Sequence, residues 1–338
     1  MEHQGTCPNS DASRPRPRLV TPVGLVLIAI SGAVLAFTSA RSVSRTNEPE
    51  LVGPGVVSTR DYERDAALSP DGRTLYFTKR TIWPYFSVIC VSHLVNGRWN
   101  EPEVASFSGR YPDATPAFSP NGNTLYFASR RPADSASTLR RDYDLWAVDR
   151  HGNEWSEPRH LPAPINTNAN ELSPSLTTGG VLYFVTDGQR PQIVRAEPDG
   201  SGWSEPVAVG ADSTSYELGV TVSPDERYLV VTVLGRPDAL GTAEGIYQRG
   251  DLYVRQRRDD GRWSELRHLP APINSAAEEG SPSLTPDGRL LFTSERGGFT
   301  EHGPRKRSTR DFEKALHEPG NGLGDLYSID AAALGIRP

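Results

Sequence analysis

A phrase of about eighteen residues recurs five times along the chain, and its regularity limits the folds that the chain can adopt. Each copy starts at an acidic residue that stands seven positions before the proline of a turn or its substitute. The acids are Glu63, Asp113, Glu171, Glu217 and Glu279, and the turn positions are Pro70, Pro120, Thr178, Pro224 and Pro286. Repeats spaced by 46 to 62 residues indicate stacked units such as the blades of a β-propeller.

Each unit is expected to form four short antiparallel strands. The first strand ends in "SPDG" or a variant, where Pro presets φ and Gly or Asn accepts the left-handed conformation. The second strand is "LYF", and the third begins at "DLW" or "DLY". The fourth opens with a tryptophan that is expected to pack between blades, at Trp99, Trp155, Trp203 and Trp263. The high counts of Gly (31) and Pro (29) also favour many short strands over long helices.

The fifth unit ends after "DLYSIDAAALGIRP" without a fourth strand. The segment 46–63, "TNEPELVGPGVVSTRDYE", matches "WSEPVAVGADSTSYE" at 203–217, so we expect residues 46–58 to supply the missing outer strand and close the ring. The predicted fold is all-β: a five-bladed β-propeller of four-stranded antiparallel blades, closed by an N-terminal strand and preceded by one N-terminal apolar helix. The blades are expected at about 59–110, 111–168, 169–214, 215–276 and 277–330.

The chain divides into an N-terminal segment 1–18, an apolar run 19–40 and the repeat region 41–338. The run has 22 uncharged residues and, as a helix, would reach about 33 Å, enough to cross a bilayer. Arg14, Arg16 and Arg18 should hold residues 1–18 in the cytoplasm and send the repeats across the membrane. Because "TSA" before Arg41 also suits signal-peptidase cleavage, a cleaved signal peptide and a retained transmembrane anchor both stay open.

The phrases "SPDGRTLYFTKR", "SPNGNTLYFASRRP" and "LPAPINTNANELSPSLTTGGVLYF" resemble the WD40-like (PD40) repeats of TolB-type periplasmic β-propellers, over roughly residues 46–330. The resemblance implies a location in the periplasm or at the cell exterior. It also implies a partner that is an envelope protein or a cell-wall component such as peptidoglycan. The chain departs from TolB itself, because it has no room for TolB's second α/β domain or its sixth blade.

The expected strand directions bring the repeat acids and a set of arginines to one end of the ring. The second strand of each unit climbs back to the acid end and finishes near an arginine: Arg80, Arg130, Arg190, Arg236 and Arg296. Long loops at about 131–143, 235–250 and 297–324 emerge at the same end, and such loops usually carry binding sites. We therefore predict a channel mouth that binds a cationic or hydroxyl-rich ligand. Its predicted ligand-binding residues are Glu63, Asp113, Glu171, Glu217 and Glu279 with Arg80, Arg130, Arg236 and Arg296.

Structural roles for the same residues are an open alternative. The acids can cap backbone groups between blades or pair with neighbouring arginines. Likewise Arg130, Arg236 and Arg296 can pair across their hairpins with Asp144, Asp251 and Asp325. His160 and His268 stand at equivalent places on separate blades, so a structural role is expected for both, and no metal or other cofactor is predicted.

One helix is expected inside the last long loop. Ser308 can cap it, with Asp311 three positions further on, and Pro319 and Gly320 should end it. As a hypothesis, this loop folds over the channel mouth.

Charge and motifs favour a binding protein over an enzyme. The net charge of −6 disfavours binding to nucleic acid, and no nucleophile elbow, P-loop, dinucleotide fingerprint or zinc motif is present. We therefore predict a monomeric, non-enzymatic scaffold with no catalytic residue assigned. The alternative is a propeller glycoside hydrolase, whose two channel carboxyls would lie about 5 to 9.5 Å apart. A third possibility is a cation such as calcium, held on the axis by the acids.

Overall fold

The computed structural model describes residues 48–336, apart from 84, 134–140, 189, 201, 211–214, 241–249 and 298–305. These residues all belong to one compact unit, Arg45–Pro338. The predicted cytoplasmic segment and the apolar run 19–40 lie outside the described residues. Within the described part of the chain, no helix is long and apolar enough to cross a membrane.

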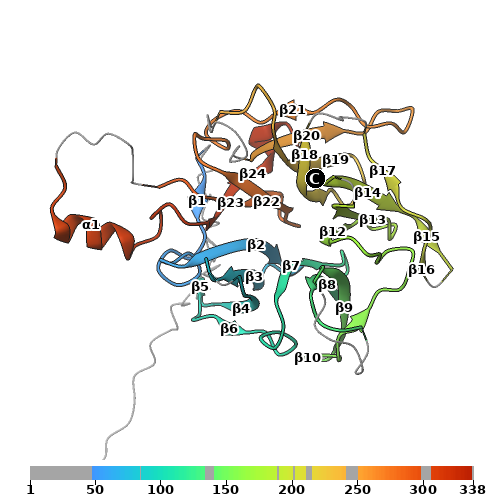
Figure 1. Cartoon of the computed structure of the whole chain (residues 1–338), viewed down its shortest axis with the longest axis horizontal. Helices are drawn as coiled ribbons and strands as arrows, with labels where there is room; N and C mark the ends of the chain where they lie inside the picture. The colour runs from blue at the N-terminus through green and yellow to red at the C-terminus, as the bar shows by residue number, and fades with distance from the viewer. Residues whose placement is uncertain are drawn as a thin grey trace, which may run out of the picture. The chain divides into compact units, whose positions relative to one another are not determined.

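Five antiparallel sheets stand around a common axis and form a five-bladed β-propeller (Figure 1), which confirms the predicted fold class. We number the blades in chain order. The first strands are β2 (Tyr62–Leu68), β7 (Asp113–Phe118), β12 (Glu171–Leu176), β18 (Tyr216–Val222) and β22 (Glu279–Leu284). The second strands are β3 (Thr74–Arg80), β8 (Thr124–Ser129), β13 (Leu182–Thr186), β19 (Tyr228–Leu234) and β23 (Arg289–Ser294).

The third and outer strands complete each blade. The third strands are β4 (Ser87–Val95), β9 (Asp144–His151), β14 (Gln192–Ala196), β20 (Asp251–Gln256) and β24 (Asp325–Asp330). The outer strands of blades 1 to 4 are short: β5 (Arg98–Trp99) and β6 (Glu103–Val104), β10 (Glu154–Trp155) and β11 (Arg159–His160), β17 (Val207–Ala208), and β21 (Arg267–His268). A two-residue ribbon, β15 (Pro198–Asp199) with β16 (Gly202–Trp203), extends blade 3.

The N-terminal segment closes the ring, as predicted. Strand β1 (Glu50–Leu51) pairs antiparallel with β24, with Glu50 opposite Ser328 and Leu51 opposite Tyr327. Beyond β1, the buried Ser58 hydroxyl donates to the Leu326 carbonyl and accepts from the Leu326 N–H, both at 3.1 Å. Blade 5 therefore takes its outer strand from residues that precede blade 1.

The outer-strand tryptophans pack against the preceding blade. Trp155 of blade 2 lies edge-on to Tyr76 of blade 1, and its indole N–H donates to the Tyr76 hydroxyl at 2.8 Å. The same edge-on arrangement recurs between later blades, in the pairs Trp203 with Tyr126 and Trp263 with Tyr183. The repeated Trp and the Tyr of "LYF" therefore interlock neighbouring blades, as expected for packing rather than ligand binding.

The expected helix is present as α1 (Thr309–Leu316). The Ser308 hydroxyl caps it by accepting from the Asp311 N–H at 3.1 Å. In Figure 1, α1 lies outside the ring of blades and not over the axis, and none of its residues is buried. The hypothesis that this loop covers the channel mouth is therefore wrong for α1.

The closure of the ring makes a testable contribution to stability. Replacing Ser58 by Ala removes the hydroxyl that accepts from the Leu326 N–H within a buried segment, so we expect Ser58→Ala to lower the free energy of unfolding by about 1 to 3 kcal/mol in urea unfolding. Ser204→Ala is the control, because the Ser204 hydroxyl serves an exposed turn where water can replace it. Equal effects of the two substitutions would contradict the assigned role of Ser58.

Candidate functional site

A narrow channel runs along the axis between the first strands of the five blades. On the side of the "SPDG" turns it holds a cavity of about 260 Å³ that all five first strands line. A second cavity of about 420 Å³ lies at the opposite end, where the repeat acids begin the strands. We call this second space the mouth cavity. Asp65, Thr115 and Ser173 line both cavities and therefore mark the constriction between them.

The constriction is built from strained backbone. Asp65, Thr115, Ser173 and Ser281 have φ angles of 56, 50, 52 and 50°. Each stands two residues after a repeat acid, at the place where its strand shifts register against the second strand. Left-handed φ is unusual for these residue types and most of all for β-branched Thr. Such strain persists only where surrounding contacts enforce it, and it often marks a functional region.

Hydroxyl groups of the neighbouring blade hold this backbone in place. In three blades, the N–H of the strained residue donates to a threonine on the second strand of the preceding blade. The pairs are Thr115 to Thr78 (3.1 Å), Ser281 to Thr232 (3.1 Å) and Asp65 to Thr293 (3.3 Å). Blade 2 has Ala128 where these blades have threonine, and the N–H of Ser173 donates instead to the Thr115 hydroxyl at 3.2 Å. The constriction is therefore tied to the contacts between blades.

The five repeat acids are buried, each with a relative exposure of 5% or less. Three of them accept hydrogen bonds from both the N–H and the hydroxyl of the residue four positions earlier. These are Glu63 with Thr59, Glu171 with Thr167 and Glu279 with Ser275. Each of these carboxylates therefore fastens the segment that leads into a blade to the start of its first strand.

The other two acids are held by different neutral donors and by an arginine, and cationic side chains also contact Glu63 and Glu279. Asp113 accepts from the hydroxyls of Ser108 and Ser129 and pairs with Arg131 at 2.8 Å. Glu217 accepts from the Ile193 N–H and pairs with Arg255 at 3.0 Å. None of the five acids lines either axial cavity. These contacts correspond to the structural alternative, and a ligand-binding role for the acids stays a prediction.

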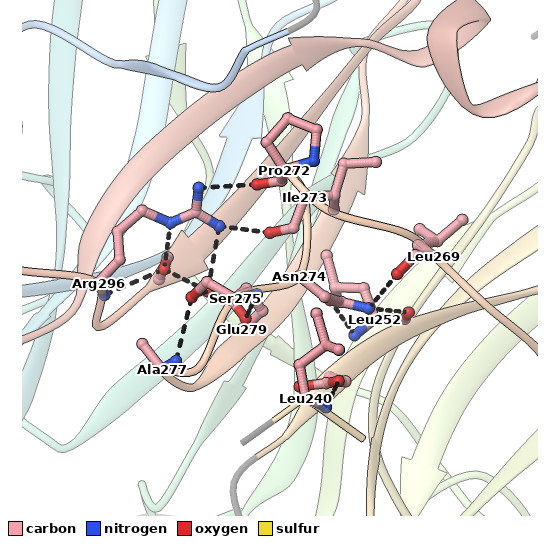
Figure 2. Close-up of polar contacts among 12 residues, drawn as sticks. Leu240, Leu252, Leu269, Pro272, Ile273, Asn274, Ser275, Ala277, Glu279 and Arg296 are labelled. Atoms are coloured by element: carbon pink, nitrogen blue, oxygen red, sulfur yellow. Dashed lines mark hydrogen bonds and ion pairs between the residues drawn. The ribbon is translucent and has the colours of Figure 1, made fainter. Parts of the chain in front are cut away.

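The predicted arginines divide into two groups. Arg80 and Arg130 line the mouth cavity, whereas Arg236 and Arg296 do not. Arg236 pairs with Asp238 at 3.0 Å. Figure 2 shows Arg296 reaching the Glu279 carboxylate and the carbonyls of Pro272 and Ile273.

The predicted hairpin partners of the arginines have other contacts. Asp144 and Asp251 contact His160 and His268, each at 2.6 Å, which gives both histidines a structural contact. Asp325 accepts from the Gly320 N–H at 2.7 Å, so the pairing of Arg296 with Asp325 is wrong.

Strand register explains why the arginines behave differently. Ser129 lies opposite Asp113, and Ser294 lies opposite Glu279. Arg130 is therefore equivalent to Glu295, and Arg296 is equivalent to Arg131, the residue that pairs with Asp113. Because successive side chains of a strand point to opposite faces, a difference of one residue separates a cavity-lining arginine from one that pairs with a buried acid.

The mouth cavity contains groups that the sequence analysis did not select. Arg64 and Asp65 of β2 line it, and Tyr85 and Phe86 line it from the loop between β3 and β4. Arg64 donates to Asp65 at 3.1 Å. Burial alone would raise the pKa of Asp65, but the Arg64 guanidinium and the hydroxyls of Ser281 and Thr78 hold it below its ordinary value. In the sequence, Asp65 could have been found as the third residue of its repeat, because this position is polar in four of the five copies.

Three other buried carboxyls near this end have raised pKa values, and burial is the cause for Glu63 as well. Burial raises the pKa of Glu171 to about 7, and the Thr167 hydroxyl and N–H only partly offset this effect. Burial likewise raises the pKa of Asp325 to about 7. Among the described residues, no group of three or more His, Cys, Asp or Glu side chains is placed to hold a metal ion.

Comparison with solved structures shows similarity to other propellers. A protein assigned as TolB from Agrobacterium tumefaciens is 14% identical over 80% of this chain and 90% of its own, with a TM-score of 0.46. TolB from Acinetobacter baumannii is 16% identical over 69% of this chain and 51% of its own, with a TM-score of 0.43. A GH62 hydrolase solved in complex with xylotriose is 11% identical over 83% of this chain and 96% of its own, with a TM-score of 0.47.

No family model and no curated protein sequence matches the chain. The similarity to the solved structures therefore concerns the fold and carries no assignment of activity or partner.

The raised pKa values predict a pH dependence of stability. A carboxyl whose folded pKa is raised stabilises the fold fully below its unfolded pKa, and this contribution is lost as the pH rises through the folded value. We expect the melting temperature to fall between about pH 4 and pH 7, and Glu171→Gln with Asp325→Asn to make this fall shallower.

The matched variant for this experiment is Thr167→Val. It removes a hydroxyl that lowers the pKa of Glu171, so the fall should extend to higher pH. Thermal unfolding at a series of pH values measures both effects. Parallel curves for the wild type and the double variant would refute the assignment.

Proposed function

We propose that the chain is a non-enzymatic TolB-type propeller with PD40 repeats, which acts outside the cytoplasm and binds an envelope protein at its mouth end. The observation that carries this proposal is a set of exposed large apolar side chains at residues 82, 83, 85 and 86, between β3 and β4. Trp83 is 82% exposed and Tyr85 is 65% exposed. Tryptophan and tyrosine supply much of the binding energy at protein interfaces, and exposed clusters of large apolar side chains are uncommon on monomers that bind nothing.

The position of this loop supports a single binding face. Tyr85 and Phe86 belong to the loop and also line the mouth cavity. Leu218, at the start of the first strand of blade 4, lines the same cavity and is 40% exposed. Aromatic and aliphatic side chains therefore line this cavity together with arginines, and aromatic residues and arginine are the types enriched at protein interfaces.

The carboxylates of the channel argue against the glycoside hydrolase alternative. Asp65 is the one carboxylate among the described residues that line the two axial cavities. Hydrolysis of a glycosidic bond by the common mechanisms needs two, one of them an acid with a raised pKa. The pKa of Asp65 is lowered and its carboxylate pairs with Arg64, so it suits neither the role of general acid nor an unpaired base.

The N-terminal sequence supports the location. The apolar run 19–40 follows three arginines, which favours transfer of residues 41–338 out of the cytoplasm. A periplasmic or exterior location gives the mouth access to envelope proteins and to peptidoglycan. Anchoring by 19–40 and cleavage after it are both compatible with the proposal.

Affinity capture tests the proposal. The full chain in mild detergent is incubated with solubilised envelope proteins, and a retained protein is identified by mass spectrometry and then rebound in purified form. We expect Trp83→Ala to weaken this rebinding about tenfold or more, since a tryptophan at an interface centre commonly contributes over 1.4 kcal/mol. Val207→Ala is the control, because Val207 is also exposed but belongs to the outer strand β17.

The outcomes separate the alternatives. Unchanged rebinding of Trp83→Ala, or an equal loss in both variants, would contradict a site at the mouth. Retention of purified peptidoglycan without any protein would move the partner to the glycan class. Release of reducing sugars from polysaccharides by the wild type would favour the hydrolase.

A further inference from the structure

Arg80 ends the second strand of blade 1 and forms part of the wall of the mouth cavity. Its guanidinium lies over the Tyr62 ring, 3.8 Å from the ring centroid, and 5.7 Å from the centroid of Tyr85. The Nε atom is buried and has no hydrogen-bond partner among the residues that the structure describes. A buried N–H without a partner is costly, so this group gains more than a solvated one from an added acceptor.

The carboxylates around Arg80 are engaged elsewhere. Glu63 accepts from Thr59 and contacts Lys79 at 3.4 Å. Glu295 accepts from the Tyr62 hydroxyl. Asp65 pairs with Arg64. Within the described part of the chain, no carboxylate forms an ion pair with Arg80, and the faces of two aromatic rings lie near its guanidinium.

The rest of the mouth cavity is also rich in positive charge. Arg64 and Arg130 join Arg80 in its lining, and Asp65 is the one carboxylate among the described lining residues. Arg64 reaches Asp65 through Nε and Ser281 through Nη2, both at 3.1 Å. Arg130 lies over the Tyr143 ring, 5.8 Å from its centroid. Three guanidinium groups thus share a space of about 420 Å³, which is within the size range of sites for small molecules.

Comparison of the blades shows that this charge is not part of the repeat. The position of Arg80 is occupied by Arg130 in blade 2, Asp187 in blade 3, Leu234 in blade 4 and Glu295 in blade 5. Two adjacent blades therefore carry arginine where the others carry acidic or apolar residues. Because this position varies between blades, its side chain is not required by the architecture that the blades share. In blades 1 and 2 it places positive charge on one side of the mouth cavity.

We propose that the mouth cavity binds a small ligand through an oxyanion, a carboxylate or a phosphate, which contacts Arg80 while the body of the ligand lies against Tyr85 and Phe86. A guanidinium suits this contact because its planar fork can donate two parallel hydrogen bonds to a carboxylate or phosphate. This inference rests on the proposed function, since it assigns a ligand class to the same mouth. It differs from the cationic or hydroxyl-rich ligand expected from the repeat acids.

Three sugars of matched shape test the ligand class. Glucuronate, glucose 6-phosphate and glucose are titrated into the full chain in mild detergent, and binding is followed by calorimetry and ligand-observed NMR. We expect at least one of the anionic sugars to bind about tenfold or more tightly than glucose. Binding of glucuronate alone identifies a carboxylate ligand, binding of glucose 6-phosphate alone identifies a phosphate ligand, and binding of both supports the shared oxyanion site. Equal binding of glucose, or no binding of either anion at 10 mM, overturns the inference.

Variants locate the site. We expect Arg80→Gln to weaken binding of the anionic sugar about tenfold or more. Arg98→Gln is the control, since it removes the same charge from an exposed residue in the outer strand β5. If Arg80→Gln does not fold, Tyr85→Ala supplies the test, because Tyr85 is exposed and contributes one of the two rings near the guanidinium. Wild-type affinity in a folded Arg80→Gln or in Tyr85→Ala overturns the inference.

The two proposals can fail independently. Loss of anion binding in Arg80→Gln with unchanged capture of an envelope protein would keep both. If no anion binds but capture of an envelope protein depends on Trp83, only the proposed oxyanion ligand is overturned and the protein-binding proposal stands. Anion binding without any captured protein would keep the oxyanion site and remove the protein-binding scaffold.

Discussion

The buried carboxylate at the head of each first strand is the contact on which the rest of the structure depends. Glu63, Glu171 and Glu279 each take both the N–H and the hydroxyl of the residue four positions earlier. Such a carboxylate satisfies buried backbone that would otherwise lack a partner. It thereby sets where the chain leaves one blade and where the next begins. In these three blades a left-handed residue of the channel wall stands two positions further on.

This architecture changes the meaning of the charged residues at the mouth. A ring of five acids at equivalent positions looks like a binding surface in sequence, but their oxygens are directed to neighbouring segments and their side chains are buried. The charge left to line the mouth cavity comes from positions of the repeated phrase that vary between the five copies, chiefly Arg64, Arg80 and Arg130. Regular repetition therefore indicates structure here, and departures from repetition indicate the part of the surface that is available for recognition.

The fold could be predicted from the sequence because its determinants are local and repeated five times. The turns stand at a fixed distance from the acids, the "LYF" strands and the tryptophans recur in order, and even the closing strand was visible as a match between 46–63 and 203–217. The candidate site could be predicted only in part. The sequence pattern indicates Arg80 and Arg130 correctly, but it also groups Arg296 with them. Arg296 lies one position further along its strand from the repeat acid than Arg130 does. Counting arginines after each "LYF" does not resolve a shift of one residue, and that shift reverses the face of the strand.

Other parts of the site depend on contacts between blades, which no single repeat encodes. The left-handed Thr115 is held by Thr78 of the preceding blade, and Arg80 packs on Tyr62, whose hydroxyl donates to Glu295 of blade 5. Blade 5 and blade 1 meet where the ring closes, through the bonds of Arg64 to Ser281 and of the Asp65 N–H to Thr293 and beside the pairing of β1 with β24. The wall of the mouth cavity around Arg80 is thus a consequence of closure. A segment that precedes the first repeat in sequence therefore contributes to the site without lining it.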